Sequence, residues 1–299
     1  MKLINKSELY NDNIGFIEQY DFSTANRSYE DRVKAISSVA SICYNSTWNG
    51  TDRLFKKLGS ESKGLPSSSY EFVPILLAVT DTSDKVWGHA TEEVWDLART
   101  DSEAELNIFK YGEFVENGNY LLTNLRALIA DIGDKADQFY NTDERDIALI
   151  KKHYKVFKTK IPLFVARQYM RHRVSWQELS RRYVSGNKQP FEFYLSESMK
   201  HINSAERLCY DTDYDTYVTD TYSTKDIFNL CIGHYLKAID KGVKPQDARG
   251  ILPQTMYTEI WSSWYPKQLE SFINLRIEAH AQNEIRELAL TKQKLLKEV

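Results

Sequence analysis

Residues 161–183 read IPLFVARQYMRHRVSWQELSRRY. An apolar run leads into residues 171–183, where five of thirteen side chains are Arg or His. A dense cation cluster beside a buried segment costs free energy unless an anion neutralises it. Arginine forks match phosphate oxygens and carbonyl edges in a way that lysine cannot. The stretch therefore predicts a pocket for a phosphorylated, heterocyclic ligand.

Two other interpretations of the cluster stay open. Arg-rich stretches are most often solvated helix faces, although Ser175, Glu178 and Ser180 between the cations are hydrogen-bonding types rather than simple counter-charges. The second alternative is a non-catalytic nucleotide- or nucleic-acid-binding protein that uses the Arg cluster for phosphates. Such a protein carries further basic stripes with interleaved aromatic residues. The formal net charge of −3 disfavours this class, so we expect no DNA partner.

The composition indicates a globular protein without a metal or a membrane segment. The 299 residues suffice to bury a sizeable core. Cys43, Cys209 and Cys231 lie far apart without a CxxC pair, and the six histidines form no HExxH motif, so we expect no metal site. No apolar run approaches the ~20 residues of a membrane span, and the first six residues lack the apolar core of a signal peptide. We expect a cytoplasmic protein.

The pattern of apolar residues predicts an α+β fold. Helical spacing predicts helices over residues 29–43, 51–58, 91–134, 162–171, 225–241 and 266–297. Alternation and short apolar runs predict strands over 72–79, 155–161 and 191–195, with 256–264 as strand or irregular structure. No repeat or linker divides the chain. We expect one domain over residues 1–299, with a central, mainly antiparallel sheet flanked by helices and a long C-terminal helix.

The predicted final helix carries a second chemical signal. Arg276 and His280 fall in or beside an apolar stripe that includes Leu269, Phe272 and Ile273. Charged side chains on the buried side of a helix favour a functional site. The alternative is an exposed Arg276–His280–Glu284 ladder on the solvent face of the helix.

Together these motifs closely resemble the flavin-dependent thymidylate synthases. Their signature is Arg-His-Arg, a spacer and Ser-x-Arg-Tyr, preceded by a helix that ends in Arg-Gln-aromatic. The matching segments here are 164–173 and 178–183, then Ala248-Arg249, Leu252-Pro253, 274–276, 280–282 and Glu284-Ile285, in the family's order and spacing. The match is strong from about residue 160 to 290 and weaker at Cys43-Tyr44 and residues 67–71.

The resemblance implies an enzyme of dTMP biosynthesis, a methyltransferase. The reaction is the reductive methylation of dUMP to dTMP, with 5,10-methylenetetrahydrofolate as carbon donor and FAD, reduced by NADPH, as hydride source. The family assembles as a homotetramer with sites at subunit interfaces. No GxGxxG occurs in the chain, which agrees with the family's non-Rossmann flavin site.

The resemblance also implies residue roles. Arg276 is the expected catalytic residue, because a guanidinium there would stabilise charge developing at N3 of uracil. The expected dUMP-binding residues are Gln168, Arg171, Glu178, Ser180, Arg181, Arg182, Arg249 and Arg276. The expected FAD-binding residues are Ser68, Arg171, His172, Arg173, Val174, Glu178, Lys267, Ser271, Leu275 and His280. Ser180 has no neighbouring base in sequence, so we expect it to bind substrate rather than to act as a nucleophile.

Three features depart from the family's pattern. The spacer between Arg173 and Ser180 has six residues instead of seven. Residues from about 80 to 154 form an extra segment relative to compact members. Tyr265, Lys267 and Ser271 stand where the family often has Asn or Arg contacts to the flavin.

Overall fold

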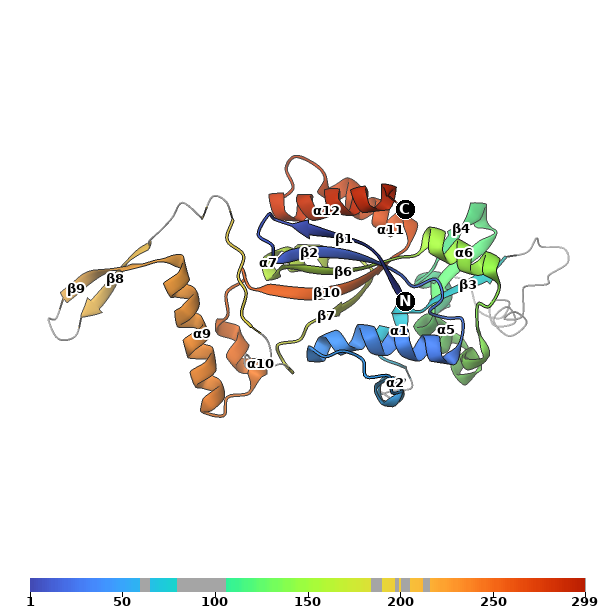
Figure 1. Cartoon of the computed structure of the whole chain (residues 1–299), viewed down its shortest axis with the longest axis horizontal. Helices are drawn as coiled ribbons and strands as arrows, with labels where there is room; N and C mark the ends of the chain where they lie inside the picture. Colours follow the sequence, from blue (N-terminus) through green and yellow to red (C-terminus); the bar gives the residue numbers. More distant parts are fainter. Residues whose placement is uncertain are drawn as a thin grey trace.

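The computed structural model describes residues 1–59, 65–79, 106–183, 190–196, 199, 205–211 and 216–298. The described chain has the expected α+β architecture, in which a five-stranded sheet is flanked by helices (Figure 1). Every pair of neighbouring strands in that sheet is antiparallel. Its strands, in spatial order, are β1 (Lys2–Leu9), β2 (Gly15–Asp21), β6 (Lys155–Pro162), β10 (Tyr257–Trp264) and β7 (Ser175–Glu178).

The two central strands are buried on both faces. Successive side chains of a strand point to opposite faces, so Ile260 and Trp264 of β10 join one hydrophobic cluster and Trp261 joins the other. Phe157 and Val156 of β6 divide in the same way. The predicted strand over 155–161 is confirmed, and residues 256–264 are a strand rather than irregular structure.

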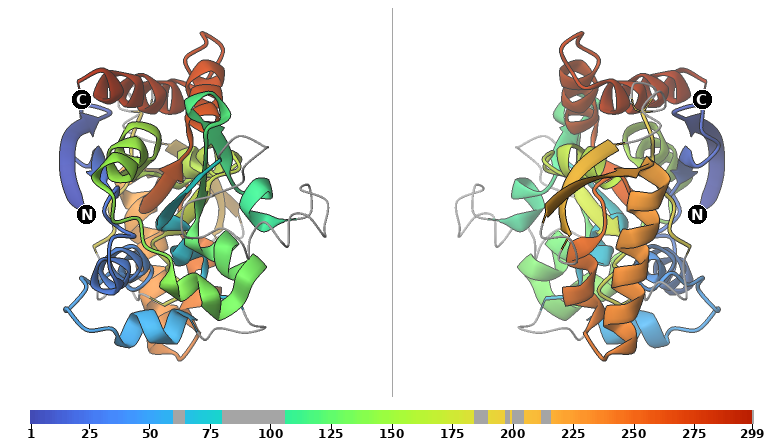
Figure 2. Two further views of the ribbon diagram at one scale, coloured as in Figure 1. Left: turned by 90° about the vertical axis from the view of Figure 1, so that its right-hand side faces the viewer. Right: turned by 90° about the vertical axis from the view of Figure 1, so that its left-hand side faces the viewer.

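Helices cover both faces of the sheet (Figures 1 and 2). One face packs against α7 (Leu163–Tyr169), α11 (Pro266–Arg276) and α12 (Asn283–Lys297), through a cluster that contains the fully buried Phe157, Trp264 and Phe272. The opposite face packs against α1 (Tyr29–Ser41), which begins where the Ser28 side chain accepts a hydrogen bond from Asp31 N. Two hydrophobic cores therefore sandwich the sheet.

The described part of the extra segment adds two strands to a second, three-stranded antiparallel sheet. Its elements are α4 (Asn107–Lys110), β4 (Glu113–Val115), β5 (Tyr120–Asn124), α5 (Leu125–Ile132) and α6 (Glu144–His153), and β5 lies between β4 and β3 (Pro74–Ala78). The predicted helix over 91–134 is confirmed at α4 and α5 and wrong for residues 113–124, which contain β4 and β5, and residues 91–105 lie outside the described residues. The apolar residues of 120–132, which show helical spacing, divide at Asn124, whose side chain caps α5 by accepting from Ala127 N. Pairing of β5 with β3 overrides the helical spacing.

An arm projects from the body at one end of the sheet (Figures 1 and 2). It consists of the hairpin β8 (Ala205–Asp211) and β9 (Thr216–Tyr222), followed by α9 (Thr224–Asp240) and α10 (Pro245–Ala248). The predicted helix over 225–241 is confirmed as α9, which begins with a capping box at Ser223. The predicted strand over 191–195 is wrong, because only Phe193 forms a bridge, to Met256.

Three helix boundaries matter for the site. Helix α2 (Arg53–Gly59) and strand β3 lie where the pattern predicts them. Helix α7 ends at Tyr169, so Arg171 lies beyond it rather than one turn after Arg167. The predicted single final helix is wrong: α11 ends at Arg276 and α12 starts at Asn283. No helix in the described ranges is both long and apolar enough to span a membrane.

The break between α11 and α12 has a packing cause. Arg286 donates through Nε to the carbonyl of Ile277 at 3.0 Å, which satisfies a backbone group at the end of α11. The break lets the apolar stripes of both helices pack into the same cluster on the sheet, through Phe272 on α11 and Leu288 on α12.

Candidate functional site

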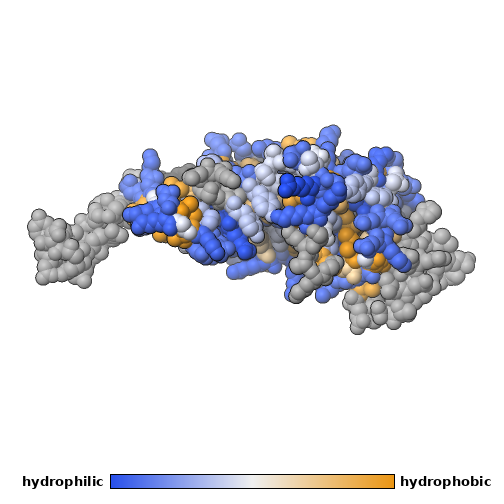
Figure 3. Space-filling model, turned by 90° about the horizontal axis from the view of Figure 1, so that it is seen from below, coloured by the Kyte–Doolittle hydropathy of each residue, from blue (hydrophilic) through white to orange (hydrophobic). Residues whose placement is uncertain are grey.

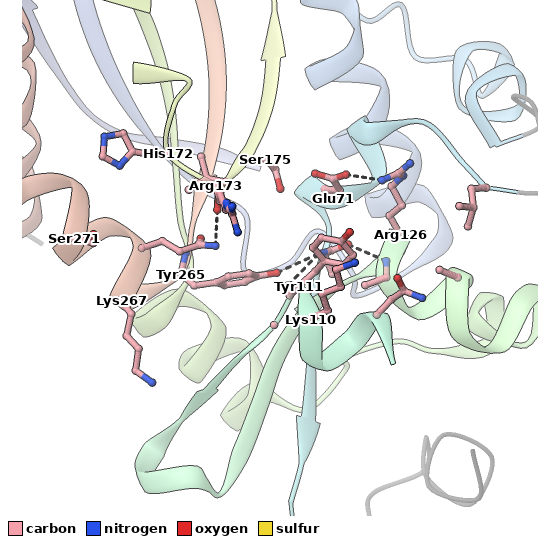
Figure 4. Close-up of a pocket in the computed structure, with 18 residues that line it drawn as sticks. Glu71, Lys110, Tyr111, Arg126, His172, Arg173, Ser175, Tyr265, Lys267 and Ser271 are labelled. Carbon is pink, nitrogen blue, oxygen red and sulfur yellow. Dashed lines mark hydrogen bonds and ion pairs between the residues drawn. The ribbon is translucent and has the colours of Figure 1, made fainter. Parts of the chain in front are cut away.

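A cavity of about 960 Å³ lies beside the Arg-His-Arg segment (Figure 4). Its volume is at the upper end of the range for small-molecule sites, about 300–1,000 Å³. One side is formed by residues 172–175 and by α11, and the other by α4, β5 and α5. Of the expected flavin-binding residues, the cavity collects five: His172, Arg173, Val174, Lys267 and Ser271.

His172 and Arg276 meet although the sequence separates them by about a hundred residues. Arg276 Nε donates to His172 Nε2 at 3.3 Å, and Arg276 Nη2 donates to the carbonyl of Gln168 at 3.4 Å. The His172 ring packs edge-on against Phe272, with 5.0 Å between centroids. Burial, and then the charge of Arg276, lower the pKa of His172 from 6.5 to about 4. A neutral imidazole therefore accepts the guanidinium hydrogen bond at neutral pH.

The Arg173 end of the segment is held by α11. Gln268 Nε2 donates to the carbonyl of Arg173 at 2.9 Å. The exposed side chains of Lys267 and Ser271 lie on the same helix and line the cavity. This arrangement fixes the backbone around Arg173 and leaves its guanidinium exposed to solvent.

Glu178 is the last residue of strand β7, which follows the Arg-His-Arg segment. Thr258 Oγ1 donates to Glu178 Oε1 at 3.0 Å. Burial raises the pKa of Glu178, and the nearby charges of Arg249 and Arg167 oppose that rise. On the preceding residue, Gln177 Nε2 donates to Ser68 Oγ at 2.6 Å. The structure thus brings Ser68, Glu178 and Arg249, which the sequence separates widely, to the region around β7.

The two arginines after Ser180 have different surroundings. Arg181 is buried, with its guanidinium 4.8 Å from the Phe191 ring centroid and Nη2 donating to the Pro190 carbonyl at 3.3 Å. Burial lowers the pKa of Arg181. Arg182 is exposed and donates through Nε to Gln246 Oε1 at 3.2 Å, next to α10. The Ser180 hydroxyl accepts from Arg182 N at 3.3 Å. Arg182 is the one of the pair that faces solvent.

The other five expected flavin contacts lie outside the cavity lining: Ser68, Arg171, Glu178, Leu275 and His280. Arg171 is exposed in the turn after α7. His280 belongs to the connection between α11 and α12, where its side chain is 76% exposed and Nδ1 lies 3.3 Å from Glu278 Oε2. The expectation that His280 sits on the final helix is therefore wrong, because the helix ends at Arg276. The Arg276–His280–Glu284 ladder is wrong for the same reason. Leu275 is 49% exposed.

Sequence reasoning missed Lys292. Its side chain is fully buried, and Nζ lies 4.1 Å from the ring centroids of both Phe157 and Trp264 and 4.7 Å from that of Tyr169. Nζ has no hydrogen-bond partner among the residues that the structure describes, and burial lowers the pKa of Lys292 well below 10.5. The signal was present, because Lys292 shares the apolar spacing of Ile285, Leu288 and Leu295.

The second wall of the cavity was also missed. Lys110, Tyr111, Asn124 and Arg126 line it, and their sequence gave no sign of it because they reach the site only through tertiary packing. The cavity lining includes four Lys or Arg residues and one carboxylate, that of Glu71. Aromatic side chains and an excess of cations suit a phosphorylated aromatic cofactor. Among the described residues, no group of three or more His, Cys, Asp or Glu could hold a metal ion.

Comparisons with known proteins match the C-terminal half of the chain. The family model described as "Thymidylate synthase complementing protein" matches residues 148–299. A flavin-dependent thymidylate synthase of Aquifex aeolicus is 36% identical over 135 residues, which cover 44% of this chain and 42% of that protein. A flavin-dependent thymidylate synthase of Thermotoga neapolitana is 32% identical over 146 residues, covering 48% of this chain and 61% of that protein. The chain thus spans about half the length of these curated relatives.

Proposed function

The chain belongs to the thymidylate synthase complementing protein family, and we propose that it is a flavin-dependent thymidylate synthase. The proposed reaction is the reductive methylation of dUMP to dTMP. Its carbon donor is 5,10-methylenetetrahydrofolate, and its hydride comes from FAD reduced by NADPH. We propose a cytoplasmic enzyme. A non-catalytic phosphate-binding role is less favoured, because it leaves the contact between Arg276 and His172 unexplained.

The observation that carries the proposal is that contact. Arg276 Nε lies 3.3 Å from His172 Nε2, next to a cavity that His172 and Arg173 line. His172 belongs to the Arg-His-Arg motif and Arg276 to the motif at residues 274–276, and the two motifs lie in separate halves of the region that the family model matches. Their meeting at one cavity supports a site that needs both, as a reaction between a flavin and a pyrimidine does.

We propose that the cavity holds the flavin in a non-Rossmann site. His172, Arg173, Val174, Lys267 and Ser271 would contact it, with Ser68 and Glu178 placed near by strand β7. When bound, FAD supplies the hydride that reduces the transferred carbon. The uncharged imidazole of His172 adds no positive charge of its own beside Arg276, while Arg173 and Lys267 supply positive charge where an anionic group of the cofactor needs it.

We propose that dUMP binds between Arg276 and the base of the arm. Arg276 presents a planar fork, and a guanidinium next to the uracil ring stabilises negative charge that develops at N3. Arg182 and Arg249 are exposed near α10 and are suited to the phosphate, together with Arg171. The other proposed dUMP-binding residues are Gln168, Glu178, Ser180 and Arg181, of which Arg181 is buried.

We propose a homotetramer with sites where subunits meet. Helix α9 leaves the body along the arm, and among its side chains only Tyr235 is buried. Ile227 is 40% exposed and Leu230 is 50% exposed. Hydrophobic atoms gather on the arm in Figure 3. An exposed apolar helix face supports contact with another copy, and symmetry would repeat that contact.

Release of tritium from 5-tritiated dUMP tests the proposed activity. Purified protein with FAD, NADPH and methylenetetrahydrofolate should release tritium and form dTMP. Omission of dUMP should still allow NADPH to reduce the flavin. Protein that binds FAD and dUMP but releases no tritium under these conditions would contradict the proposal.

A further inference from the structure

The cavity has one wall outside the region that the family model matches. That model matches residues 148–299. Asn107, Lys110, Tyr111, Asn124 and Arg126 line the cavity from the extra segment. In Figure 4 Lys110, Tyr111 and Arg126 lie opposite His172, Arg173 and Ser271. The extra segment therefore contributes directly to the site.

Hydrogen bonds hold this second wall in place. The Asp131 carboxylate accepts from Asn107 N at 3.0 Å and from Ile108 N at 2.9 Å, which ties α4 to α5. Gly112 lets the chain turn closely after α4, because a Cβ atom there would lie 2.3 Å from the carbonyl oxygen of Ile108. The backbone of this wall is thus held in a defined position.

The same wall is joined to the residues that replace the family's usual flavin contacts. Asn124 Nδ2 donates to the hydroxyl of Tyr265 at 3.3 Å. Both carboxylate oxygens of Glu113 accept from Lys267 N at 3.1 Å. Two of the departures from the family's pattern, the extra segment and the Tyr265–Lys267 pair, are therefore one structural unit.

The charges on this wall suit an anion. Lys110 and Arg173 form no salt bridge with a carboxylate in the part of the chain that the structure describes. Glu71, the one carboxylate in the lining, is paired with Arg126 at 2.9 Å. Lys110, Arg173 and Lys267 therefore leave the cavity with an excess of positive charge. Lys110 Nζ lies 5.3 Å from the ring centroid of Tyr111, whose side chain is 50% exposed. A free ammonium group beside an open aromatic ring can bind a phosphate joined to a flat heterocycle.

We infer that the wall formed by Lys110 and Tyr111 binds the adenosine diphosphate half of FAD. The inference rests on the proposed function, which assigns the reactive flavin ring to the side with His172. The remaining half of the cofactor then extends along the cavity to the opposite, cation-bearing wall. Lys110 neutralises pyrophosphate charge, and Tyr111 offers a face for adenine to stack on. The extra segment thus selects FAD over smaller flavins.

Flavin affinities test the inference without turnover. We would titrate the wild type, Lys110→Ala and Tyr111→Leu with FAD and with riboflavin, and follow flavin fluorescence. Each variant should weaken FAD binding by on the order of tenfold, the scale of one charge-assisted contact, and should change riboflavin affinity less than about twofold. The matched control is Arg145→Ala, an exposed cation on α6 outside the cavity lining, which should leave both affinities unchanged.

The outcomes separate this inference from the proposed function. Equal loss of FAD and riboflavin affinity, or no loss of either, would overturn the role of the wall while leaving a flavoprotein. Unchanged FAD affinity with a raised KM for methylenetetrahydrofolate would assign the wall to the folate and also overturn the inference. A wild type that binds neither flavin would refute the proposed function and the inference together. Melting temperatures of the variants check folding, and both side chains are exposed enough to be replaced.

Discussion

Arg276 Nε donates a hydrogen bond to His172 Nε2 over 3.3 Å. The acceptor must be an unprotonated nitrogen, which the lowered pKa of His172, about 4, provides at neutral pH. The contact joins the last residue of α11 to the turn after α7. It holds the Arg276 guanidinium in one orientation without neutralising its charge.

Replacement of Arg276 by Lys should lower turnover by on the order of 10²-fold, the scale of removing one preorganised donor. Lysine keeps the charge but loses the planar fork that serves both His172 and the Gln168 carbonyl. Reduction of the flavin by NADPH without dUMP should be nearly unchanged. Stopped-flow and tritium-release rates measure the two steps. The control is Arg286→Lys, on the adjoining helix, and normal methylation by Arg276→Lys would remove Arg276 from the site.

Stability should fall as the pH falls from about 6.5 toward about 4, and His172 should contribute to the loss. Burial lowers the pKa of His172 in the folded protein, so in this window the unfolded chain binds a proton that the folded chain does not. Stability then rises with pH across the window. Melting temperatures of wild type and His172→Gln should differ in pH slope. His234→Gln, an exposed histidine on α9, is the control, and identical slopes for wild type and His172→Gln would contradict the assignment.

Arg182→Ala should weaken dUMP binding by about 1.5–3 kcal/mol, the range for a hydrogen bond to a charged group. The side chain is exposed beside Gln246, so folding should be preserved. Deoxyuridine lacks the phosphate and should bind the wild type and the variant alike. Calorimetric titration measures both ligands. Equal losses for dUMP and deoxyuridine would exclude a phosphate contact.

Lys292→Met should raise the free energy of unfolding by about 1–3 kcal/mol, because a buried polar group without a hydrogen bond is costly. Contacts with the rings of Phe157 and Trp264 offset part of this cost. Burial lowers the pKa of Lys292, so wild-type stability should rise with pH toward 10.5 and the advantage of the variant should shrink there. Denaturant unfolding at several pH values measures this. Lys294→Met, with a 72% exposed side chain, is the control, and a destabilised Lys292→Met would mean that the ring contacts outweigh desolvation.

Leu230→Glu should shift the assembly toward smaller species. The side chain is 50% exposed on α9, and a carboxylate in an apolar contact between subunits is costly. Light scattering at micromolar concentration measures the mass. Lys237→Glu, a polar position on the same helix, is the control. A monomeric wild type would contradict the tetramer itself.

Short-range patterns carried much of the fold and half of the site. The alternation of residues 155–161 predicted β6, because a strand buried in a sheet shows its period in neighbouring residues. In the same way, the helical spacing of apolar residues predicted α1 and α9. Arg171, His172 and Arg173 were predicted to belong to a site because they are consecutive and follow an apolar run.

Long-range packing decided the rest. The spacing of residues 120–132 fits a helix, yet β5 forms because β3 lies beside it to accept its backbone hydrogen bonds. Residues 266–297 fit one helix, yet the chain breaks after Arg276 so that α11 and α12 both bury their apolar faces on the sheet.

By itself, the sequence determined the chemistry of this protein: which cations, carboxylates and aromatic rings are present, and which of them stand together on one element. Only the tertiary structure decided that Arg276 meets His172 beside the cavity and that Asn124 meets Tyr265 in the cavity lining. The physical reason is that a contact between distant segments forms only after loop closure, and its free energy comes from shared burial that no local pattern records.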